Sequence, residues 1–209
     1  MPLKVQLKQG SLTDGDELVL VNASNTNAQL GTGVSGAIRA ACGEGFQRHI
    51  VEEMGRQKGG PMTPGDLFIT DAGTHPRAKH VAHVAVMDYR FDFGPSSYPD
   101  PGRIRTACER LWEALEQVST PGPLSVAMPA LGAGTGNLGV REPTRIAAQT
   151  LKAHFAIFPR PRIERVCFYG FQAVEHLAMA AELSRHYPEV LEGLSAEQRS
   201  HVEALIKAG

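Results

Sequence analysis

Two segments of this chain run from a short apolar stretch through a glycine-rich loop into a helical pattern. Residues 18–21 (LVLV) precede the loop NASNTNAQLGTGVSG, and residues 124–128 (LSVAM) precede the loop PALGAGTGNLG. Short continuous apolar runs are typical of strands that are buried on both faces of a parallel sheet. In such sheets both loops leave the carboxyl ends of their strands, where α/β proteins bind ligands. The pair therefore indicates an α/β fold with one ligand-binding rim.

The rest of the chain alternates strand and helix. Residues 3–8 alternate apolar and polar side chains, as a half-buried strand does. Further strands are expected at residues 66–70, 80–87 and 165–169. Helical patterns cover residues 37–54, 103–117, 142–158 and 172–186. This order predicts the α/β class with a mostly parallel sheet. Because the composition has no internal break, we expect a single domain over residues 1–187.

Residues 188–209 form a tail outside this alternation. Ser195 and Gln198 have the spacing of a capping box, which marks the start of a helix. They precede a small apolar face made of Val202, Leu205 and Ile206. We expect a helical tail that packs on the domain; a contact with a partner is the alternative role of its apolar face.

Charge and cysteine content exclude several classes of function. The formal net charge is -1 and the isoelectric point is about 6.7. Such a chain attracts neither nucleic acid nor an anionic membrane through bulk charge, so a phosphate ligand must be held locally. Three widely spaced cysteines offer no disulfide framework, and neither a signal peptide nor a membrane-length apolar stretch occurs. We expect a cytoplasmic monomer without a cofactor, and no ligand spacing indicates a metal site.

The glycines in the two loops have a physical role in anion binding. Without a Cβ, glycine lets backbone N–H groups approach a phosphate, and the helix that follows adds unpaired donors and a positive dipole end. Residues 31–36 and 134–139 both match GxGxxG, a string of weak specificity. Either loop alone is equally well read as a tight turn. A Rossmann dinucleotide site is disfavoured, because residues 23–30 separate the strand from the first glycine, and Glu52 and Glu53, the acidic residues about 20 positions on, lie in a helical pattern.

At these residues the chain resembles the macrodomain family. Residues 21–25 (VNASN) are similar to the family's VNAAN segment, and residues 31–38 (GTGVSGAI) to its first glycine-rich loop. Residues 129–134 (PALGAG) resemble the start of its second loop, and residues 81–86 (VAHVAV) fit its central strand. The resemblance leaves out the tail after Tyr187. It implies a three-layer α/β/α sandwich with a mixed, mostly parallel sheet and an ADP-ribose cleft along the rim.

The resemblance also implies roles for individual residues. Asn25 would hydrogen-bond the distal ribose and is the one candidate catalytic residue. The two glycine-rich loops would wrap the diphosphate. Phe171, after the last strand, is a candidate for stacking on adenine, with an ordinary core aromatic as the alternative. The candidate ligand-binding residues are Ser11, Asn22, Asn25, Gly31, Gly33, Val34, Ser35, Gly36, Gly132, Ala133, Gly134, Thr135, Gly136, Asn137 and Phe171.

Three departures from the family pattern bear on activity. Ser11 stands where the family often has an aspartate that contacts the adenine amine, and a hydroxyl is a weaker acceptor than a carboxylate. Asp14 or Asp16 is a candidate replacement. Ser35 stands where hydrolytic members commonly carry an aspartate that activates water. Residues 135–137 (TGN) lack the aromatic that often covers the distal ribose.

These observations predict a module that binds ADP-ribose or a derivative of it, free or attached to protein, between the two glycine-rich loops. The alternative is an ADP-ribosyl or O-acetyl-ADP-ribose hydrolase that uses the same cleft without the usual aspartate. A dinucleotide-dependent oxidoreductase is a more distant third hypothesis.

Overall fold

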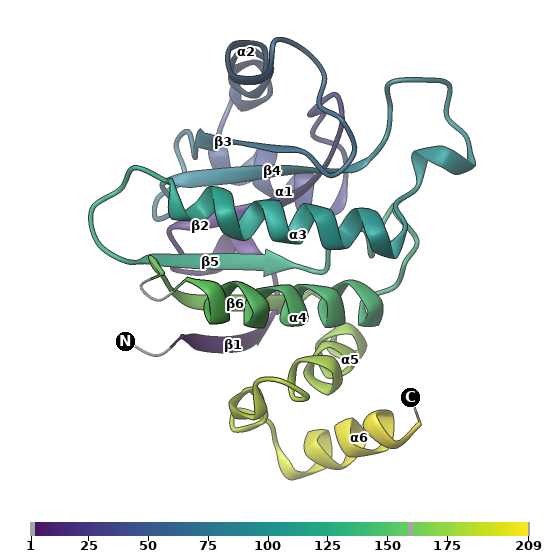
Figure 1. Ribbon diagram of the computed structural model, residues 1–209. Coiled ribbons are helices and arrows are strands. Elements are labelled where there is room, and N and C mark those ends of the chain that lie inside the picture. The colour runs from purple at the N-terminus through teal and green to yellow at the C-terminus, as the bar shows by residue number, and fades with distance from the viewer. Residues whose placement is uncertain (1–2, 159–160, 209) are drawn as a thin grey trace.

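A mixed β-sheet forms the centre of the molecule (Figure 1). The computed structural model describes residues 3–158 and 161–208. Within them, six strands are arranged in the order β1-β6-β5-β2-β4-β3, and all neighbours are parallel except β3 and β4. Their bounds are β1 Lys4–Gln9, β2 Val19–Asn25, β3 Leu67–Asp71, β4 His80–Met87, β5 Leu124–Pro129 and β6 Ile163–Gly170. The predicted mixed, mostly parallel sheet is confirmed.

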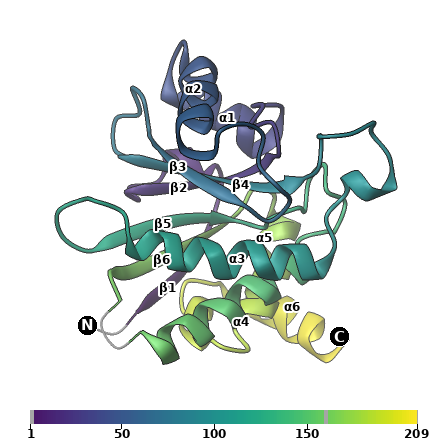
Figure 2. The ribbon, with the colours of Figure 1, turned by 45° about the horizontal axis from the view of Figure 1, so that its top comes forward.

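Helices cover both faces of the sheet (Figures 1 and 2). One face packs against α1 (Gly33–Cys42) and α2 (Phe46–Lys58), and the other against α3 (Pro101–Glu116), α4 (Arg141–Ile157) and α5 (Ala173–Leu183). Alternate residues of β2 serve the two cores, because successive side chains of a strand point to opposite faces. The predicted three-layer α/β/α architecture is confirmed.

The structure divides the helical pattern at residues 37–54 into two helices. The break lies at Gly43 and Gly45, whose φ angles are +93° and +81°. Glycine adopts this left-handed region at no steric cost, so α1 ends and α2 begins on a new axis. A second difference is that β2 continues to Asn25, four residues beyond the apolar run. Three of the four added residues are polar, and hydrogen bonds of the Asn22, Ser24 and Asn25 side chains let them stay buried.

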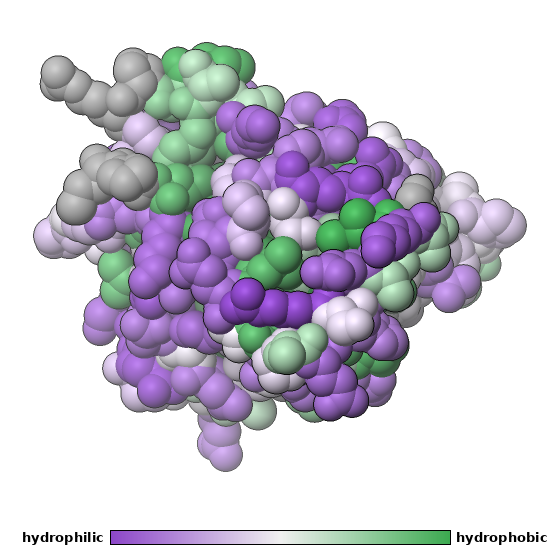
Figure 3. Space-filling view, turned by 90° about the horizontal axis from the view of Figure 1, so that it is seen from below, coloured by the Kyte–Doolittle hydropathy of each residue, from purple (hydrophilic) through white to green (hydrophobic). Residues whose placement is uncertain are grey.

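The chain ends in helix α6 (Ala196–Lys207), which packs on α5. Its first turn has the predicted capping box: the Gln198 backbone N–H donates to Ser195 Oγ at 3.2 Å, and the Ser195 backbone N–H donates to Gln198 Oε1 at 2.9 Å. Val202 is fully buried against Ala180 and Ala181 of α5. Figure 3 views the molecule from below Figure 1, and that face is mostly hydrophilic with small hydrophobic patches. The apolar side of α6 therefore faces the protein; the division into a domain and a tail stays a prediction.

Five parallel strands end at the same edge of the sheet. Along this edge the chain leaves β1 at Gly10, β6 at Phe171, β5 at residue 130, β2 at Thr26 and β4 at Asp88. The backbone N–H of Gly10 donates to the Gly170 carbonyl at 3.0 Å, which joins the first two of these ends. Both glycine-rich loops lie on this edge, as their positions after β2 and β5 require.

Candidate functional site

A cleft of about 350 Å³ lies along this edge of the sheet. Its volume falls within the range of small-molecule sites. It extends from the ends of β1 and β6 to the two glycine-rich loops. The lining residues are Gly10, Ser11, Leu12, Gly33, Val34, Ala37, Pro129, Ala130, Ala133, Gly134, Val140, Tyr169, Gly170, Phe171, Glu175 and Met179. Most of these side chains are apolar or absent, so backbone groups supply most of the polar surface.

The first glycine-rich loop presents the start of α1 to the cleft. Gly33, Val34 and Ala37 line it. Gly33 has φ +59°, and a Cβ there would meet no atom within 4 Å, so the position is open and left-handed. The N-cap residue Thr32 makes no side-chain hydrogen bond to the helix. The first N–H groups of α1 are therefore not capped by Thr32, which is the arrangement that favours an anion at a helix start.

A chain of buried hydrogen bonds holds this loop from behind. Ser35 Oγ donates to Asn22 Oδ1 at 2.8 Å, and Asn22 Nδ2 donates to His83 Nδ1 at 3.2 Å. His83 Nε2 then donates to Thr70 Oγ1 at 3.1 Å, and that hydroxyl donates to the Asp71 carbonyl at 2.7 Å. Burial lowers the pKa of His83 to about 3, so the ring is neutral. Ser35 and Asn22 therefore anchor α1 to the sheet, and neither lines the cleft.

Asn25 also holds the loop instead of facing the cleft. Its Nδ2 donates to the Gln29 carbonyl at 2.9 Å, and its Oδ1 accepts from the N–H groups of Asn27 at 3.1 Å and Gln29 at 3.2 Å. Both polar atoms are engaged by the turn that follows β2. Contact with a ribose requires Asn25 to exchange these bonds, so its binding and catalytic roles stay predictions.

The second glycine-rich loop is held by close packing. A Cβ on Gly136 would overlap the Gly132 carbonyl oxygen and lie 2.7 Å from Pro99 Cγ. Gly132 has φ +81° and is itself packed against Pro99. Gly134 has open space around it and lines the cleft together with Ala133. Two glycines of this loop, Gly132 and Gly136, thus permit packing, while Gly134 leaves room for a ligand in the cleft.

Helix α4 begins at the end of this loop in the same way as α1. Its N-cap residue Val140 lines the cleft and has no side chain that caps the helix. Asn137 has φ +57°, a conformation that Asn tolerates better than most residues. Two helix starts without side-chain caps therefore border one cleft.

The far end of the cleft is aromatic. Phe171 is 70% exposed and lines the cleft, so it is not a core aromatic. Ser11 follows β1, next to β6 in the sheet, and also lines the cleft; its Oγ is hydrogen-bonded to Thr13 Oγ1 at 2.8 Å. Glu175, on the first turn of α5, also lines the cleft. Its Oε2 accepts from the Gln172 N–H at 2.9 Å.

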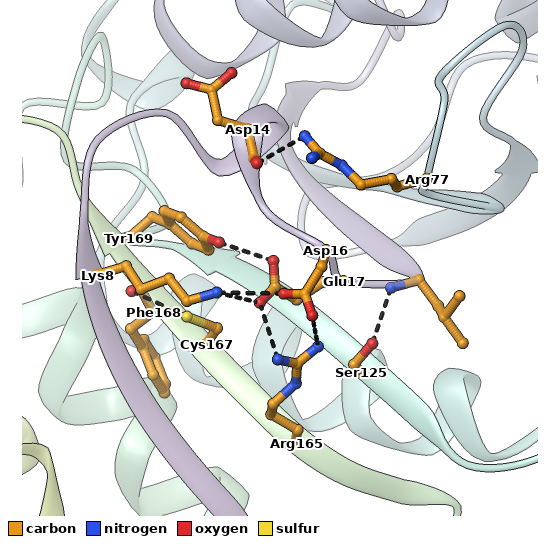
Figure 4. Close-up of polar contacts among 11 residues, drawn as sticks. Lys8, Asp14, Asp16, Glu17, Arg77, Ser125, Arg165, Cys167, Phe168 and Tyr169 are labelled. Carbon is orange, nitrogen blue, oxygen red and sulfur yellow. Dashed lines mark hydrogen bonds and ion pairs between the residues drawn. The ribbon is translucent and has the colours of Figure 1, made fainter.

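An ionic network lies behind this end of the cleft and ties the loop after β1 to β6 (Figure 4). The carboxylate of Glu17 is fully buried, and it accepts from Tyr169 Oη at 2.8 Å and from Lys8 Nζ at 3.1 Å. Asp16 accepts from Arg165 Nη2 at 3.0 Å and from Lys8 Nζ at 3.3 Å. Burial and the bond to Glu17 raise the pKa of Tyr169, while the bond to Arg165 lowers that of Asp16. The Tyr169 hydroxyl is thus hydrogen-bonded to Glu17, which does not line the cleft, and the Tyr169 ring forms part of the cleft wall.

Neither a membrane-spanning helix nor a metal cluster is found in residues 3–158 and 161–208. No helix there is long and apolar enough to cross a bilayer. The same residues contain no group of three or more His, Cys, Asp or Glu side chains that would hold a metal ion.

The family model of the Macro domain matches residues 21–147, which include both glycine-rich loops. The chain belongs to the Macro domain family. It is 32% identical over 157 residues to an uncharacterised protein of Aeropyrum pernix, a match that covers 74% of each chain. It is 31% identical over 168 residues to a Cronobacter turicensis protein named O-acetyl-ADP-ribose deacetylase, covering 79% of this chain and 89% of the relative. The resemblance inferred from the two loops is confirmed.

Solved macrodomains share the fold of this Macro domain. A Trypanosoma brucei macrodomain in complex with ADP-ribose superposes with a TM-score of 0.67 at 23% identity, covering 84% of this chain and 67% of that chain. An Oceanobacillus iheyensis macrodomain mutant with ADPR gives a TM-score of 0.67 at 20% identity, covering 90% and 91%.

The cleft brings together six of the fifteen candidate ligand-binding residues: Ser11, Gly33, Val34, Ala133, Gly134 and Phe171. The other nine support the loops or lie beside them: Asn22, Asn25, Gly31, Ser35, Gly36, Gly132, Thr135, Gly136 and Asn137. Sequence reasoning missed the other lining residues: Gly10, Leu12, Ala37, Pro129, Ala130, Val140, Tyr169, Gly170, Glu175 and Met179. A usable signal existed for Glu175, because it is the N3 residue of a capping box whose N-cap, Gln172, directly follows the predicted aromatic. The binding roles of all these residues stay predictions.

Proposed function

We propose that this Macro domain binds ADP-ribose or a derivative of it, free or attached to protein, in the cleft between the two glycine-rich loops. One observation carries the proposal: the starts of α1 and α4, neither with a side-chain cap, border the same cleft beside open glycines. Backbone N–H groups at such helix starts suit a diphosphate. The ADP-ribose complexes of solved macrodomains with this fold support the same ligand.

The arrangement of the edge supports one orientation of the ligand. Phe171 provides an exposed aromatic face at the β6 end, which suits a purine. Gly33 and Gly134 leave space beside the helix starts, which suits the diphosphate. The distal ribose then lies toward the loop after β2, near Asn25, and the group that carries the ADP-ribose leaves the cleft on that side.

Calorimetric titration with ADP-ribose, beside AMP, ATP and NAD, tests the proposal. We expect a Kd in the micromolar range, roughly -8 kcal/mol, as suits a diphosphate held mainly by neutral backbone donors. ADP-ribose should bind more tightly than the three other nucleotides. A flat titration with folded protein up to millimolar ADP-ribose would remove the proposal.

Hydrolysis of O-acetyl-ADP-ribose or of ADP-ribosyl esters is the second candidate function. It is favoured by the relative named O-acetyl-ADP-ribose deacetylase. Ser35 is a poor base for this route, because its hydroxyl donates to Asn22 and is buried. We therefore expect hydrolysis to be slow or absent in an assay for released acetate or ADP-ribose. Brisk turnover that falls in Asn25→Ala would make hydrolysis the leading function.

We also infer that the chain acts in the cytoplasm as a monomer, with residues 188–209 as a tail on a domain of residues 1–187. Cys42, Cys108 and Cys167 are buried free thiols, which supports a reducing compartment. Burial raises the pKa of each to about 12, so they are also unreactive. Sedimentation analysis at micromolar concentration tests the monomer, and fractionation of cells tests the location.

A further inference from the structure

We propose that Glu175 selects a 6-aminopurine in the cleft by accepting a hydrogen bond from the exocyclic amine of the base. This inference rests on the proposed function and adds a residue that reads the identity of the base.

The first observation is electrostatic. Among the described residues that line the cleft, Glu175 is the one whose side chain is charged. The other titratable one, Tyr169, directs its hydroxyl to Glu17 outside the cleft. A carboxylate repels a diphosphate, and it can only accept hydrogen bonds. It therefore suits the part of the ligand that donates, which for a nucleotide is the amine of the base or a ribose hydroxyl.

The second observation is the place of the carboxylate beside the aromatic. Glu175 Oε2 accepts from the N–H of Gln172 at 2.9 Å, and Gln172 directly follows Phe171. The carboxylate is thus hydrogen-bonded to the peptide group that joins Phe171 to Gln172, which places it next to the exposed ring. Oε1 has no hydrogen-bond partner among residues 3–158 and 161–208, and it is free to accept from a base stacked on Phe171. This favours the base over the ribose as the donor.

The third observation is that the first turn of α5 is fixed against the end of β6. A Cβ on Gly170 would lie 2.7 Å from the backbone N and Cα of His176 and 3.1 Å from the carbonyl carbon of Glu175. The Gly170 carbonyl also accepts from the Gly10 N–H at 3.0 Å. This contact of α5 with backbone atoms leaves little freedom, so Glu175 and Phe171 keep one relative position. Such rigidity is what selectivity between similar bases requires.

Ser11 does not provide an equivalent acceptor. It also lines the cleft, but its hydroxyl is already hydrogen-bonded to Thr13 Oγ1 at 2.8 Å and accepts from the Thr13 N–H at 3.4 Å. A neutral, engaged hydroxyl is a weaker acceptor than a carboxylate. Glu175 is therefore the stronger of the two candidates for the amine.

The test compares ADP-ribose with its hypoxanthine analogue, inosine diphosphate ribose, in which an accepting carbonyl replaces the donating amine. The wild-type protein should prefer ADP-ribose, because the carbonyl of hypoxanthine faces the carboxylate. In Glu175→Gln the amide side chain can donate to that carbonyl. We expect the ratio of the two dissociation constants, analogue over ADP-ribose, to fall by about tenfold or more in this variant. ADP-ribose should bind more weakly and the analogue more tightly.

Glu175→Gln is suited to this test because Gln at this position also accepts from the N-cap N–H, so the capping box of α5 is kept. The matched control is Glu113→Gln, which removes the same charge from an exposed position on α3. The control should leave both affinities unchanged.

The outcomes separate the two proposals. If the wild-type protein binds neither analogue, the proposed function fails and this inference fails with it. If both analogues bind and Glu175→Gln leaves their ratio unchanged, the inference alone is overturned. A fall of both affinities by the same factor also overturns it, because Glu175 then shapes the cleft without reading the base.

Discussion

The two glycine-rich loops share a sequence string and a place on the sheet, but they are held in different ways. The first is held by side chains: Ser35 and Asn22 form a buried hydrogen-bond chain to His83, and Asn25 closes the turn. The second is held by packing, because Gly132 and Gly136 let backbone and Pro99 approach closely. In the first loop Gly31 and Gly33 have open space, whereas in the second the open glycine on the cleft is Gly134.

The difference teaches that a match to GxGxxG says little about the role of each glycine. A glycine is needed for packing where a Cβ would overlap another atom, and for binding where the space is open and faces the ligand. In the first loop polar residues hold the structure and Gly31 and Gly33 stay open, whereas a Cβ on Gly36 would lie 3.1 Å from the Gly31 carbonyl oxygen. In the second loop the glycines are divided between both tasks.

The largest expected effect separates the open glycines from the rest. Gly134→Glu should eliminate ADP-ribose binding, a loss of about a thousandfold or more, because it fills the diphosphate path and adds a repelling charge. Its unfolding free energy should stay close to that of the wild type. Gly33→Glu should also eliminate binding but lose about 1 kcal/mol of stability, since its φ is +59°.

Calorimetry and urea unfolding measure these two effects. Gly55→Glu is the control, because it adds the same charge to an open position on α2. Unchanged affinity in both Gly134→Glu and Gly33→Glu would place the ligand elsewhere.

The next effect tests packing in the second loop. Gly136→Ala should lower the unfolding free energy by about 2–3 kcal/mol, because the new Cβ would overlap the Gly132 carbonyl oxygen. Gly134→Ala, two residues earlier in an open position, should change it by less than about 0.5 kcal/mol. Equal urea midpoints for the two variants would contradict the division of roles in this loop.

A third prediction concerns pH and the buried support of the first loop. The pKa of His83 is about 3 in the folded protein against an ordinary value of 6.5. Between these values the unfolded chain binds the proton and the folded protein does not, so stability is lost as the pH falls below about 6.5.

For His83 alone the loss approaches about 1.4 kcal/mol per pH unit within that window. Urea unfolding of the wild type and of His83→Gln from pH 7 to 5 should show a shallower decline in the variant. The pKa values of His80, His176 and His186 are also lowered. Both proteins contain these histidines, so their contributions to the pH dependence cancel in the difference. If the unfolding free energy of both proteins declined in parallel, the pKa of His83 would not be lowered by burial.

The smallest effect tests the hydrogen bond that anchors α1. Ser35→Ala removes the donor to Asn22 Oδ1 and should lower the unfolding free energy by about 1 kcal/mol. ADP-ribose affinity should change little, because Ser35 does not line the cleft. Thermal unfolding and calorimetry measure the two quantities. A large loss of affinity with unchanged stability would mean that Ser35 contacts the ligand directly.

The sequence by itself determined the class of fold, the family and the edge that carries the site. These follow from local signals: apolar runs of strand length, helical periodicity, and two glycine-rich loops after buried strands. It also indicated Gly33, Gly134 and Phe171, which line the cleft. Such features depend on the order of residues along the chain, so they are readable before the chain is folded.

Only the tertiary structure decided which polar residues face the cleft and which hold the loops. Asn22 and Ser35 lie in a loop motif, yet they bond to each other, and Asn22 also bonds to His83, which lies 61 residues further along the chain. Glu175 is remote from both loops in sequence, and it reaches the cleft because α5 packs on Gly170. The direction of a side chain depends on partners that are distant in sequence, and buried polar groups turn toward whichever partners the packed sheet places beside them.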